Sequence, residues 1–295
     1  MDNREGSNGR DAGTPPPIGA WRGGTALRGA RWRRRSPAFM LKSPPFARES
    51  GFILWAERLA LVAVPLAICA ILLARSGRVE PTYAVVVLVV AALLAMLALA
   101  VLGVGAIDMW RHGRIGLFRL FRTLVLALAV LAGPAWLAIE AGRLPLLNDV
   151  TTDLDDPPEF SRSSAALAAR RGHVPAVRDP RERERQRPAY SDLRPMVLDM
   201  EAEPAFRLVL EAVQALRWRV IEQSAPGGRS GQGRIEAVSE TFLMRFEDDI
   251  TIRIRPSPAG TRVDIRSASR IGRHDFGANA KRIRRLTEEI LAQRE

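Results

Sequence analysis

The feature that most constrains this chain is a long stretch without a single charge. Residues 83–107 read YAVVVLVVAALLAMLALAVLGVGAI. A helix that crosses a bilayer needs about 20 mostly apolar residues, and this stretch satisfies that length. Two further apolar runs flank it, LALVAVPLAICAILLA at 59–74 and LVLALAVLAGPAWLAI at 124–139. The cores of water-soluble proteins rarely place three such runs so close together. We therefore predict a three-helix transmembrane region at 51–142, with spans at about 52–74, 83–107 and 117–139.

The distribution of arginine predicts how these helices are oriented. The loop between the first two spans, RSGRVEP, has few cations and an offsetting Glu80. The segment before the first span and the loop between the second and third spans are richer in arginine: Arg48, Arg58, Arg111, Arg114, Arg119 and Arg122. By the positive-inside rule, the N-terminus and the second loop face the cytoplasm, and everything after about Gly142 lies outside it. We expect a multi-pass protein of the bacterial inner membrane, with membrane lipid as a partner.

Residues 1–50 are rich in Arg, Gly and Pro and show neither a helical nor a strand period. This composition predicts a disordered basic tail. The whole chain has a formal net charge of +12, a balance that suits nucleic acid or anionic lipid. A cytoplasmic tail before a membrane span explains the charge better, so no nucleic-acid partner is expected. Translation from Met40 instead of Met1 would still leave a short basic lead-in, and the residues leave both starts open.

The chain after the third span reads as a soluble α+β domain. In PAFRLVLEAVQALR the apolar residues fall at helical spacing, and WRVIEQS and RIEAVSET follow as strands. Ile250, Ile252 and Ile254 alternate with polar residues, and residues 262–266 repeat this pattern after a Pro- and Gly-containing turn, which predicts a hairpin. A last helix covers about 276–290, and Asp275 is placed to cap it. Its apolar stripe would consist of Phe276, Ala280, Ile283, Leu286 and Ile290, with Arg282, Arg284, Arg285 and Glu288 facing away. We expect an antiparallel sheet of mainly four strands with flanking helices.

Four segments of this part resemble a known family. They read LNDVTTDLDDPPEF, AYSDLRPMVL, GRIEAVSETFLMRFEDDITIRIRP and GTRVDIRSASRIGRHDFGANAKRIRRL. Together they resemble the DUF1499 family, a bacterial domain without assigned function, over about residues 146–294. The chain departs from the family at Leu243-Met244-Arg245-Phe246, where an aromatic residue and a glycine are common. The resemblance implies the limits of an extracytoplasmic domain and an envelope setting, but no chemistry.

The stretch SASRIGRHDFGANAKRIRR at 267–285 offers the candidate site. Arginines lie near a Gly-containing turn that leads into a helix N-terminus, where backbone donors and the helix dipole favour an anion. We predict an anion site formed by Arg266, Ser269, Arg270, Arg273 and Asn279. The competing interpretation is a structural ion network that locks the hairpin to the helix, formed by these arginines with Asp248, Asp249, Arg253, Asp264 and Asp275. The sequence favours neither over the other.

These observations lead to two functional hypotheses. The favoured one is a binding or assembly module for an anionic envelope component or partner protein, without catalysis. The alternative is an envelope esterase or hydrolase with Ser267 or Ser269 as nucleophile, His274 as base and Asp275 as its orienter. Adjacent His and Asp residues fit this triad poorly, because the carboxylate cannot readily reach the imidazole while the ring reaches a serine. Asp275 also has a clearer role as a helix cap.

Metal and cofactor sites are not expected from the residues. The only cysteine, Cys69, lies inside an apolar run, so no disulfide within the chain and no cysteine zinc site can form. The carboxylates of Asp149, Asp153, Asp155 and Asp156 lack the spacing of a calcium loop and its distal Glu. GGRSGQGR is Gly-rich but has no Gly-Lys-Ser/Thr, so it is not a phosphate-binding loop of the P-loop type.

Overall fold

The computed structural model describes residues 49–174, 179–227 and 231–294. The predicted basic tail lies outside the described residues except for its last two positions. Among the described residues, three helices are long and apolar enough to cross a membrane: α1 (Gly51–Arg75), α2 (Pro81–His112) and α3 (Leu117–Arg143). The three predicted spans all fall within these helices.

Helices α1 and α2 pack through small side chains. Ala56, Ala60 and Ala63 of α1 are fully buried, as are Ala91, Ala95 and Ala98 of α2. A Cβ atom added at Gly105 would lie 2.8 Å from Cγ1 of Ile53, so glycine permits the close approach of the two helices. Small residues at such a seam are typical of membrane helices, which associate by close packing rather than by the hydrophobic effect.

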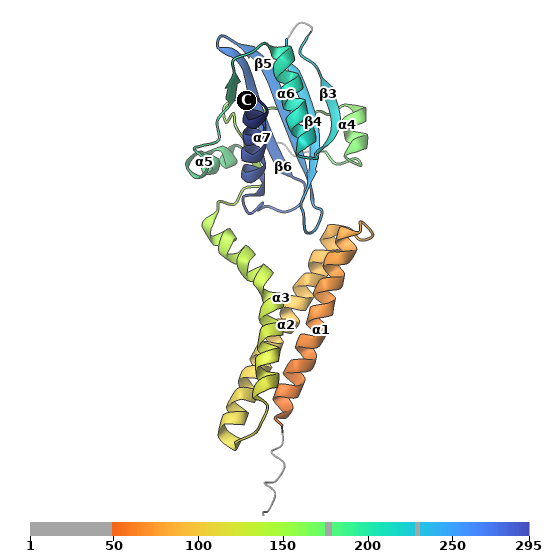
Figure 1. Ribbon diagram of the computed structural model, residues 1–295, viewed down its shortest axis with the longest axis vertical. Helices are drawn as coiled ribbons and strands as arrows, with labels where there is room; N and C mark the ends of the chain where they lie inside the picture. The colour runs from red at the N-terminus through yellow and green to blue at the C-terminus, as the bar shows by residue number, and fades with distance from the viewer. Residues whose placement is uncertain (1–48, 175–178, 228–230, 295) are drawn as a thin grey trace, which may run out of the picture. The chain divides into compact units, whose positions relative to one another are not determined.

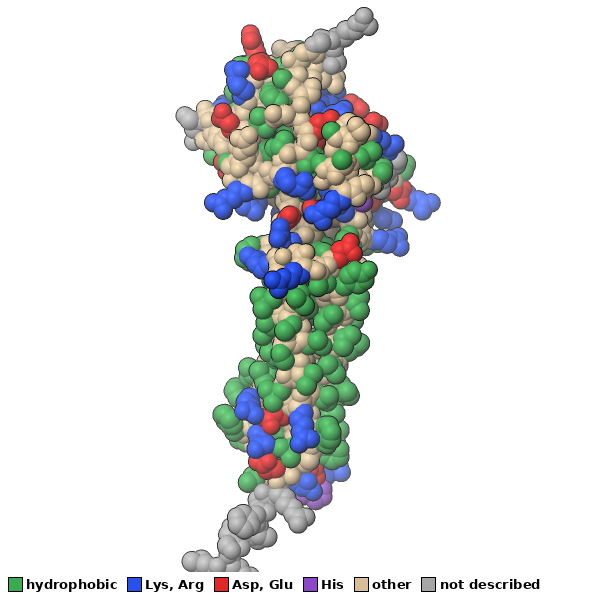
Figure 2. Space-filling view, turned by 90° about the vertical axis from the view of Figure 1, so that its right-hand side faces the viewer, with side chains coloured by type: hydrophobic (Ala, Val, Ile, Leu, Met, Phe, Trp, Pro, Cys, Tyr) green, Lys and Arg blue, Asp and Glu red, His purple; other side chains and the backbone are tan. Residues whose placement is uncertain are grey.

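The outward surfaces of these helices are apolar. Figure 2 shows hydrophobic side chains covering them, and the exposed residues include Leu61, Val62, Val86, Val89 and Phe118. Charges gather at the end that holds the α2–α3 loop, where Glu57 of α1 accepts from Arg122 and lies 3.5 Å from Arg119 of α3. Such a surface is stable only where lipid covers it, because water would solvate neither the leucines nor the valines. These helices therefore indicate insertion in a membrane.

The soluble part contains an antiparallel sheet with the strand order β1-β6-β5-β4-β3, in which β2 also pairs with β6. Its strands are β1 (Asp149–Thr151), β2 (Met196–Leu198), β3 (Arg219–Ser224), β4 (Gly233–Glu240), β5 (Glu247–Ser257) and β6 (Gly260–Ser269). The α+β class is confirmed, with four main strands as predicted. The two additional strands, β1 and β2, have three residues each, which is too short to show an alternating pattern in the sequence.

Two helices lie across one face of this sheet, α6 (Ala202–Ala215) and α7 (Ala278–Arg294), as Figure 1 shows. The core between these layers contains Ile250, Ile252, Ile254, Val209, Val213, Ile283 and Leu286, all of them buried. The short helices α4 (Ser164–Ala169) and α5 (Pro180–Ala189) lie outside this layer. Helix α5 contains the charged run RERERQR. Asp179 caps this helix, accepting from the backbone N–H of Arg181.

The β5–β6 hairpin has the register that the alternation predicted. Arg253 lies directly opposite Asp264, and the strands run on to Ser257 and Gly260 around a two-residue turn. Gly260 has a φ of 115°, and a Cβ there would lie 2.2 Å from the carbonyl oxygen of Leu198 in β2. Only glycine therefore lets the hairpin turn pass beside β2 at this distance.

The last helix begins later than expected. Asp275 caps it, because Oδ1 accepts from the N–H of Gly277 at 2.9 Å and Oδ2 from that of Asn279 at 2.8 Å. Phe276 has a φ of 51° and precedes the helix, so it does not belong to the apolar stripe in which the pattern placed it. Arg282, expected on the outward face, is 8% exposed and points to the sheet. The carboxylate of Asp248 on β5 accepts from Arg282 Nη2 at 2.5 Å, and this ion pair accounts for the difference.

Candidate functional site

The face of the sheet opposite α6 and α7 contains charges that are buried and paired. Arg170, which follows α4, donates from Nη2 to Glu236 Oε2 at 2.6 Å and from Nε to Asp249 Oδ1 at 3.0 Å. Arg266 of β6 donates from Nη2 to Asp149 Oδ2 at 2.6 Å. The ring of Phe160 has both guanidinium groups near it, at 5.7 and 4.8 Å from its centroid. The segment between α3 and α5 therefore covers much of this face.

The burial of this network shifts the pKa of its central acid. Burial raises the pKa of the Glu236 carboxyl, while the hydroxyl of Thr251, the N–H of Ser161 and the charge of Arg170 oppose that shift. Each oxygen of Glu236 accepts a hydrogen bond, Oε1 from Thr251 at 2.8 Å and from Ser161 at 3.0 Å. Arg170 and Glu236 were not predicted as partners, because they lie 66 residues apart in the chain.

The five residues of the predicted anion site do not form one site. Arg266 is 5% exposed and held by Asp149, and Arg270 donates to Asp249 at 2.8 Å and to Glu247. Ser269 and Asn279 lie on the opposite face of the sheet, where Asn279 Nδ2 donates to Ser269 Oγ at 3.0 Å. The reason is the alternation of side chains along β6, which sends positions 266 and 269 to different faces. Of these five residues, Arg273 is the one that is exposed and lacks an ion pair or hydrogen bond among the described residues.

The residues of the alternative network are mostly paired. Asp248 accepts from Arg282 Nη2 at 2.5 Å, and Arg253 donates to Asp264 Oδ2 from Nε at 3.1 Å and from Nη2 at 2.9 Å. Burial raises the pKa of Asp248, opposed by the charge of Arg282. Asp275 accepts from backbone N–H groups and pairs with no arginine among the described residues. These contacts lie on both faces of the sheet, so they form two separate clusters. Of the two pairs, the one between Asp248 and Arg282 joins the hairpin to α7.

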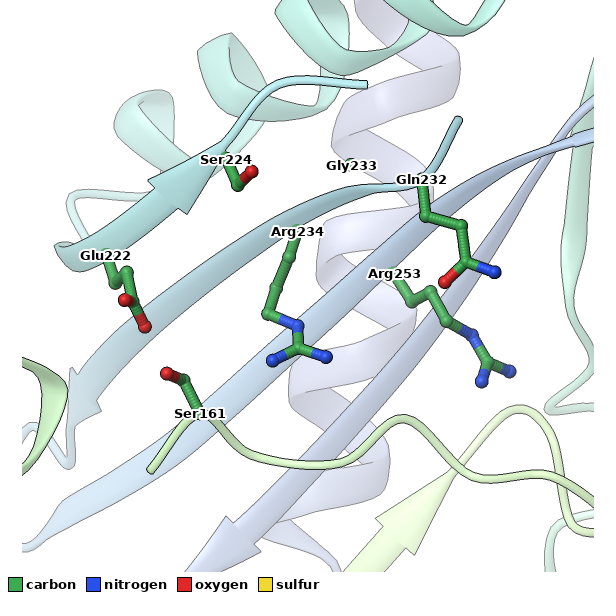
Figure 3. Close-up of a pocket in the computed structure, with 7 residues that line it drawn as sticks. All are labelled: Ser161, Glu222, Ser224, Gln232, Gly233, Arg234 and Arg253. Carbon is green, nitrogen blue, oxygen red and sulfur yellow. The ribbon is translucent and has the colours of Figure 1, made fainter. Parts of the chain in front are cut away.

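A pocket remains on the polar face, lined by Ser161, Glu222, Ser224, Gln232, Gly233, Arg234 and Arg253. Its volume is about 260 Å³, and Figure 3 shows the side chains of Arg234 and Arg253 extending into it. These two arginines occupy directly opposite positions on β4 and β5. Ser161 belongs to the covering segment, and Glu222 and Ser224 belong to the edge strand β3.

The two arginines of this pocket differ in their partners. Arg253 is fixed, since it also donates to the Asp156 carboxylate at 2.9 Å and to the Asp156 carbonyl at 2.7 Å. Arg234 is exposed and makes no hydrogen bond or ion pair with any described residue. One carboxylate oxygen of Glu222, Oε2, is buried without a hydrogen-bond partner among the described residues. The pocket therefore presents one unpaired guanidinium beside a fixed one.

The comparison with known families decides the identity of this part. Residues 149–290 match a family described as "Protein of unknown function (DUF1499)". The chain's soluble part is a DUF1499 domain. No curated protein matches the chain. The DUF1499 domain thus begins at β1 and ends in α7, and Arg234, Arg253 and the buried network all belong to it.

Within the DUF1499 domain, the residues of the hydrolase hypothesis do not form a triad. His274 Nδ1 accepts from the N–H of Phe276 at 2.9 Å, and its ring stacks on that of Phe276 at 4.6 Å. Its Nε2 is buried without a partner among the described residues, while Ser269 bonds Asn279. The carboxylate of Asp275 accepts hydrogen bonds from the N–H groups of Gly277 and Asn279 at the start of α7. No hydrogen bond in the described part of the domain connects Ser269, or Ser267, with His274.

The aspartates at the start of the DUF1499 domain bind arginines and backbone groups. Asp153 Oδ1 accepts from the N–H groups of Asp155 and Asp156, each at 3.1 Å, and Oδ2 accepts from Arg262 at 2.5 Å. Burial favours a raised pKa for Asp153, but these two N–H groups and the nearby arginines together lower it. The described residues contain no group of three His, Cys, Asp or Glu side chains arranged to hold a metal ion.

Proposed function

We propose that this protein is a membrane-anchored binding module of the bacterial envelope whose DUF1499 domain holds an anionic envelope component or an anionic group of a partner protein. The single observation that carries the proposal is the unpaired guanidinium of Arg234 in the pocket that it shares with Arg253. Guanidinium groups suit carboxylates and phosphates, which accept two parallel hydrogen bonds from the planar fork.

The pairing of strands explains why an anion would be favourable there. Like charges directly opposite each other on antiparallel strands destabilise the pair. The charge of Arg253 is balanced by Asp264 and Asp156, whereas Arg234 has no carboxylate within ion-pair distance among the described residues. A bound carboxylate or phosphate would supply that missing charge, and the hydroxyl groups of Ser161 and Ser224 are available as further donors at the rim.

We propose the inner membrane as the location, with the N-terminus in the cytoplasm and the domain outside it. The arginines of the α2–α3 loop support this orientation by the positive-inside rule, since Arg111, Arg114, Arg119 and Arg122 lie within or next to that loop. Three crossings then leave the DUF1499 domain on the side of the membrane opposite to the cytoplasmic N-terminus. Its ligand would accordingly be a component of the envelope.

The hydrolase hypothesis receives no support from the geometry, because no described contact joins a serine with His274. It remains testable by the change His274→Ala. Ester hydrolysis by the purified protein that disappears in this variant, while the thermal unfolding midpoint is retained, would establish catalysis and displace the binding module as the proposal.

The binding proposal is tested with the full-length protein in detergent micelles and inorganic phosphate or citrate as probes. Each probe should raise the thermal unfolding midpoint of the unmodified protein in a saturable way. The variant Arg234→Gln should lose this shift, whereas the matched control Arg285→Gln, an exposed arginine on α7, should retain it. An equal shift in Arg234→Gln, or none in the unmodified protein, would overturn the assignment of the pocket.

A further inference from the structure

Two loops at one end of the sheet expose apolar side chains. The β4–β5 turn follows Glu240, which pairs with Glu247, and the β6–α7 loop follows Ser269, which pairs with Asp248, so both loops leave the same end. Phe242 and Leu243 in the first loop are 82% and 52% exposed, and Ile271 in the second is 48% exposed. Large apolar side chains that gather at loop tips usually mark a contact surface.

This end of the sheet is tied to the residues that follow the third membrane helix. The carbonyl of Asn148 accepts from the N–H of Ser269 at 2.8 Å, and its side-chain Nδ2 donates to the carbonyl of Gly272 at 2.8 Å. The carbonyl of Leu147 accepts from the N–H of Asp275 at 2.9 Å. The β6–α7 loop is therefore held by the segment through which the chain enters the domain.

The length of that segment limits how far the loops can be from the membrane. Helix α3 ends at Arg143, and Asn148 is five residues later (148 − 143). A fully extended chain spans at most about 3.6 Å per residue, so Asn148 lies within about 18 Å of the end of α3. This limit follows from the covalent chain and from contacts inside the domain alone. Each headgroup layer is roughly 5–8 Å thick, because the two layers together add about 10–15 Å to the hydrocarbon core. The linker therefore keeps the loops within a few layer thicknesses of the end of α3.

The chemistry of the loops suits that layer. Phenylalanine and leucine are typical of the apolar side that interfacial elements bury at the boundary between headgroups and acyl chains. Arg273, in the same loop as Ile271, is exposed and lacks a partner among the described residues, so its guanidinium is available for lipid phosphate. An exposed phenylalanine beside an exposed leucine is unfavourable in water and favourable in the interfacial layer.

We infer that the DUF1499 domain rests with this end on the bilayer that holds its own helices, with Phe242, Leu243 and Ile271 in the headgroup layer and Arg273 on lipid phosphate. The inference needs the membrane helices but not the proposed ligand of the Arg234 pocket. Arg234 is six residues from Glu240 along β4, about 20 Å at the rise of a strand, so the pocket lies near the end of the sheet away from the lipid.

The experiment places an environment-sensitive fluorophore at a single cysteine in the full-length protein. In a Cys69→Ala background, Phe242→Cys is labelled with nitrobenzoxadiazole and the protein is reconstituted in nanodiscs of phosphatidylcholine and phosphatidylglycerol. The matched control is Val197→Cys, because Val197 is also exposed, at 48%, but lies on β2 beside the start of β6 at the opposite end of the sheet. Both variants must keep the thermal unfolding midpoint of the background.

The label at 242 should have a blue-shifted emission and be quenched by lipids that bear a spin label at the headgroup, whereas the label at 197 should behave as in water. Addition of Arg273→Glu should weaken the quenching at 242 in discs with phosphatidylglycerol. Water-like emission at 242 would overturn the inference. Blue-shifted emission without lipid quenching, together with a particle that holds two copies, would overturn it in favour of a contact between copies of the chain.

Discussion

Arg170 lies fully inside the DUF1499 domain and donates to Glu236 Oε2 across 2.6 Å, joining the segment after α3 to the middle of β4. The remaining donors of the guanidinium reach Asp249 Oδ1 at 3.0 Å and the carbonyl of Ser161 at 2.8 Å. This one side chain therefore fastens the covering segment to two central strands. Its role is structural, because no face of it is open to a ligand.

Replacement of Arg170 should destabilise the domain strongly. The variant Arg170→Met leaves Glu236 and Asp249 buried beside an apolar chain, and removal of one partner from a buried ion pair costs about 3–5 kcal/mol. The control is Arg171→Met, whose side chain is 80% exposed and whose loss should cost under about 1 kcal/mol. Denaturant unfolding of the full-length protein, followed by near-ultraviolet circular dichroism, measures both. Equal stability of the two variants would contradict the structural role of Arg170.

The stability of the domain should depend on pH through Asp153. The pKa of its carboxyl is lowered in the folded protein, so the unfolded chain binds its proton at a higher pH than the folded one. Its contribution is present above the unfolded pKa, about 4, and is lost as the pH falls through the lower folded pKa. The variant Asp153→Asn should thus be less stable than the unmodified protein at pH 7, and the gap should narrow below pH 4. Unfolding free energies measured from pH 7 to 3 check this; a gap that widens toward acid would contradict it.

Gly260 should tolerate no side chain. Its φ of 115° is strained for any other residue, and a Cβ would collide with the carbonyl oxygen of Leu198 at 2.2 Å. Gly260→Ala should therefore cost about 2 kcal/mol or more and loosen β2 from β6. Gly227→Ala is the matched control, because a Cβ at Gly227 meets no atom within 4 Å and should leave stability nearly unchanged. The thermal unfolding midpoints of both variants test this prediction. A faster hydrogen exchange of the Leu198 amide would show directly that β2 has loosened from β6.

The orientation proposed for the membrane helices predicts opposite results at two fusion points. Alkaline phosphatase, which is active only outside the cytoplasm, should be active when fused after Glu295 and inactive when fused after Gly113 in the α2–α3 loop. A cytoplasmic reporter such as β-galactosidase should show the reverse. Phosphatase activity at Gly113 with none at the C-terminus would place the DUF1499 domain in the cytoplasm and remove the envelope role proposed for it.

Local patterns in the chain were sufficient to predict several parts of this architecture. The uncharged run at 83–107 lies within α2, because a span needs only length and apolarity, and both are visible residue by residue. The hairpin of β5 and β6, with Arg253 opposite Asp264, follows from alternation on either side of a short turn. Asp275 was recognisable as a cap because a helix N-terminus needs an acceptor at that one position.

Other features depend on segments that meet only after folding. Asp149 and Arg266 form an ion pair although they lie 117 residues apart in the chain. The inward direction of Arg282 depends on Asp248 of β5, which lies beneath α7. Side-chain alternation along β6 divided the predicted anion site between the two faces, and the same sheet left Arg234 unpaired beside Arg253. The sequence alone determined the apolar spans, the hairpin and the helix cap, since these arise from neighbouring residues. Which charges are paired and which remain available depends on where distant segments cross, and this could be read only from the folded chain.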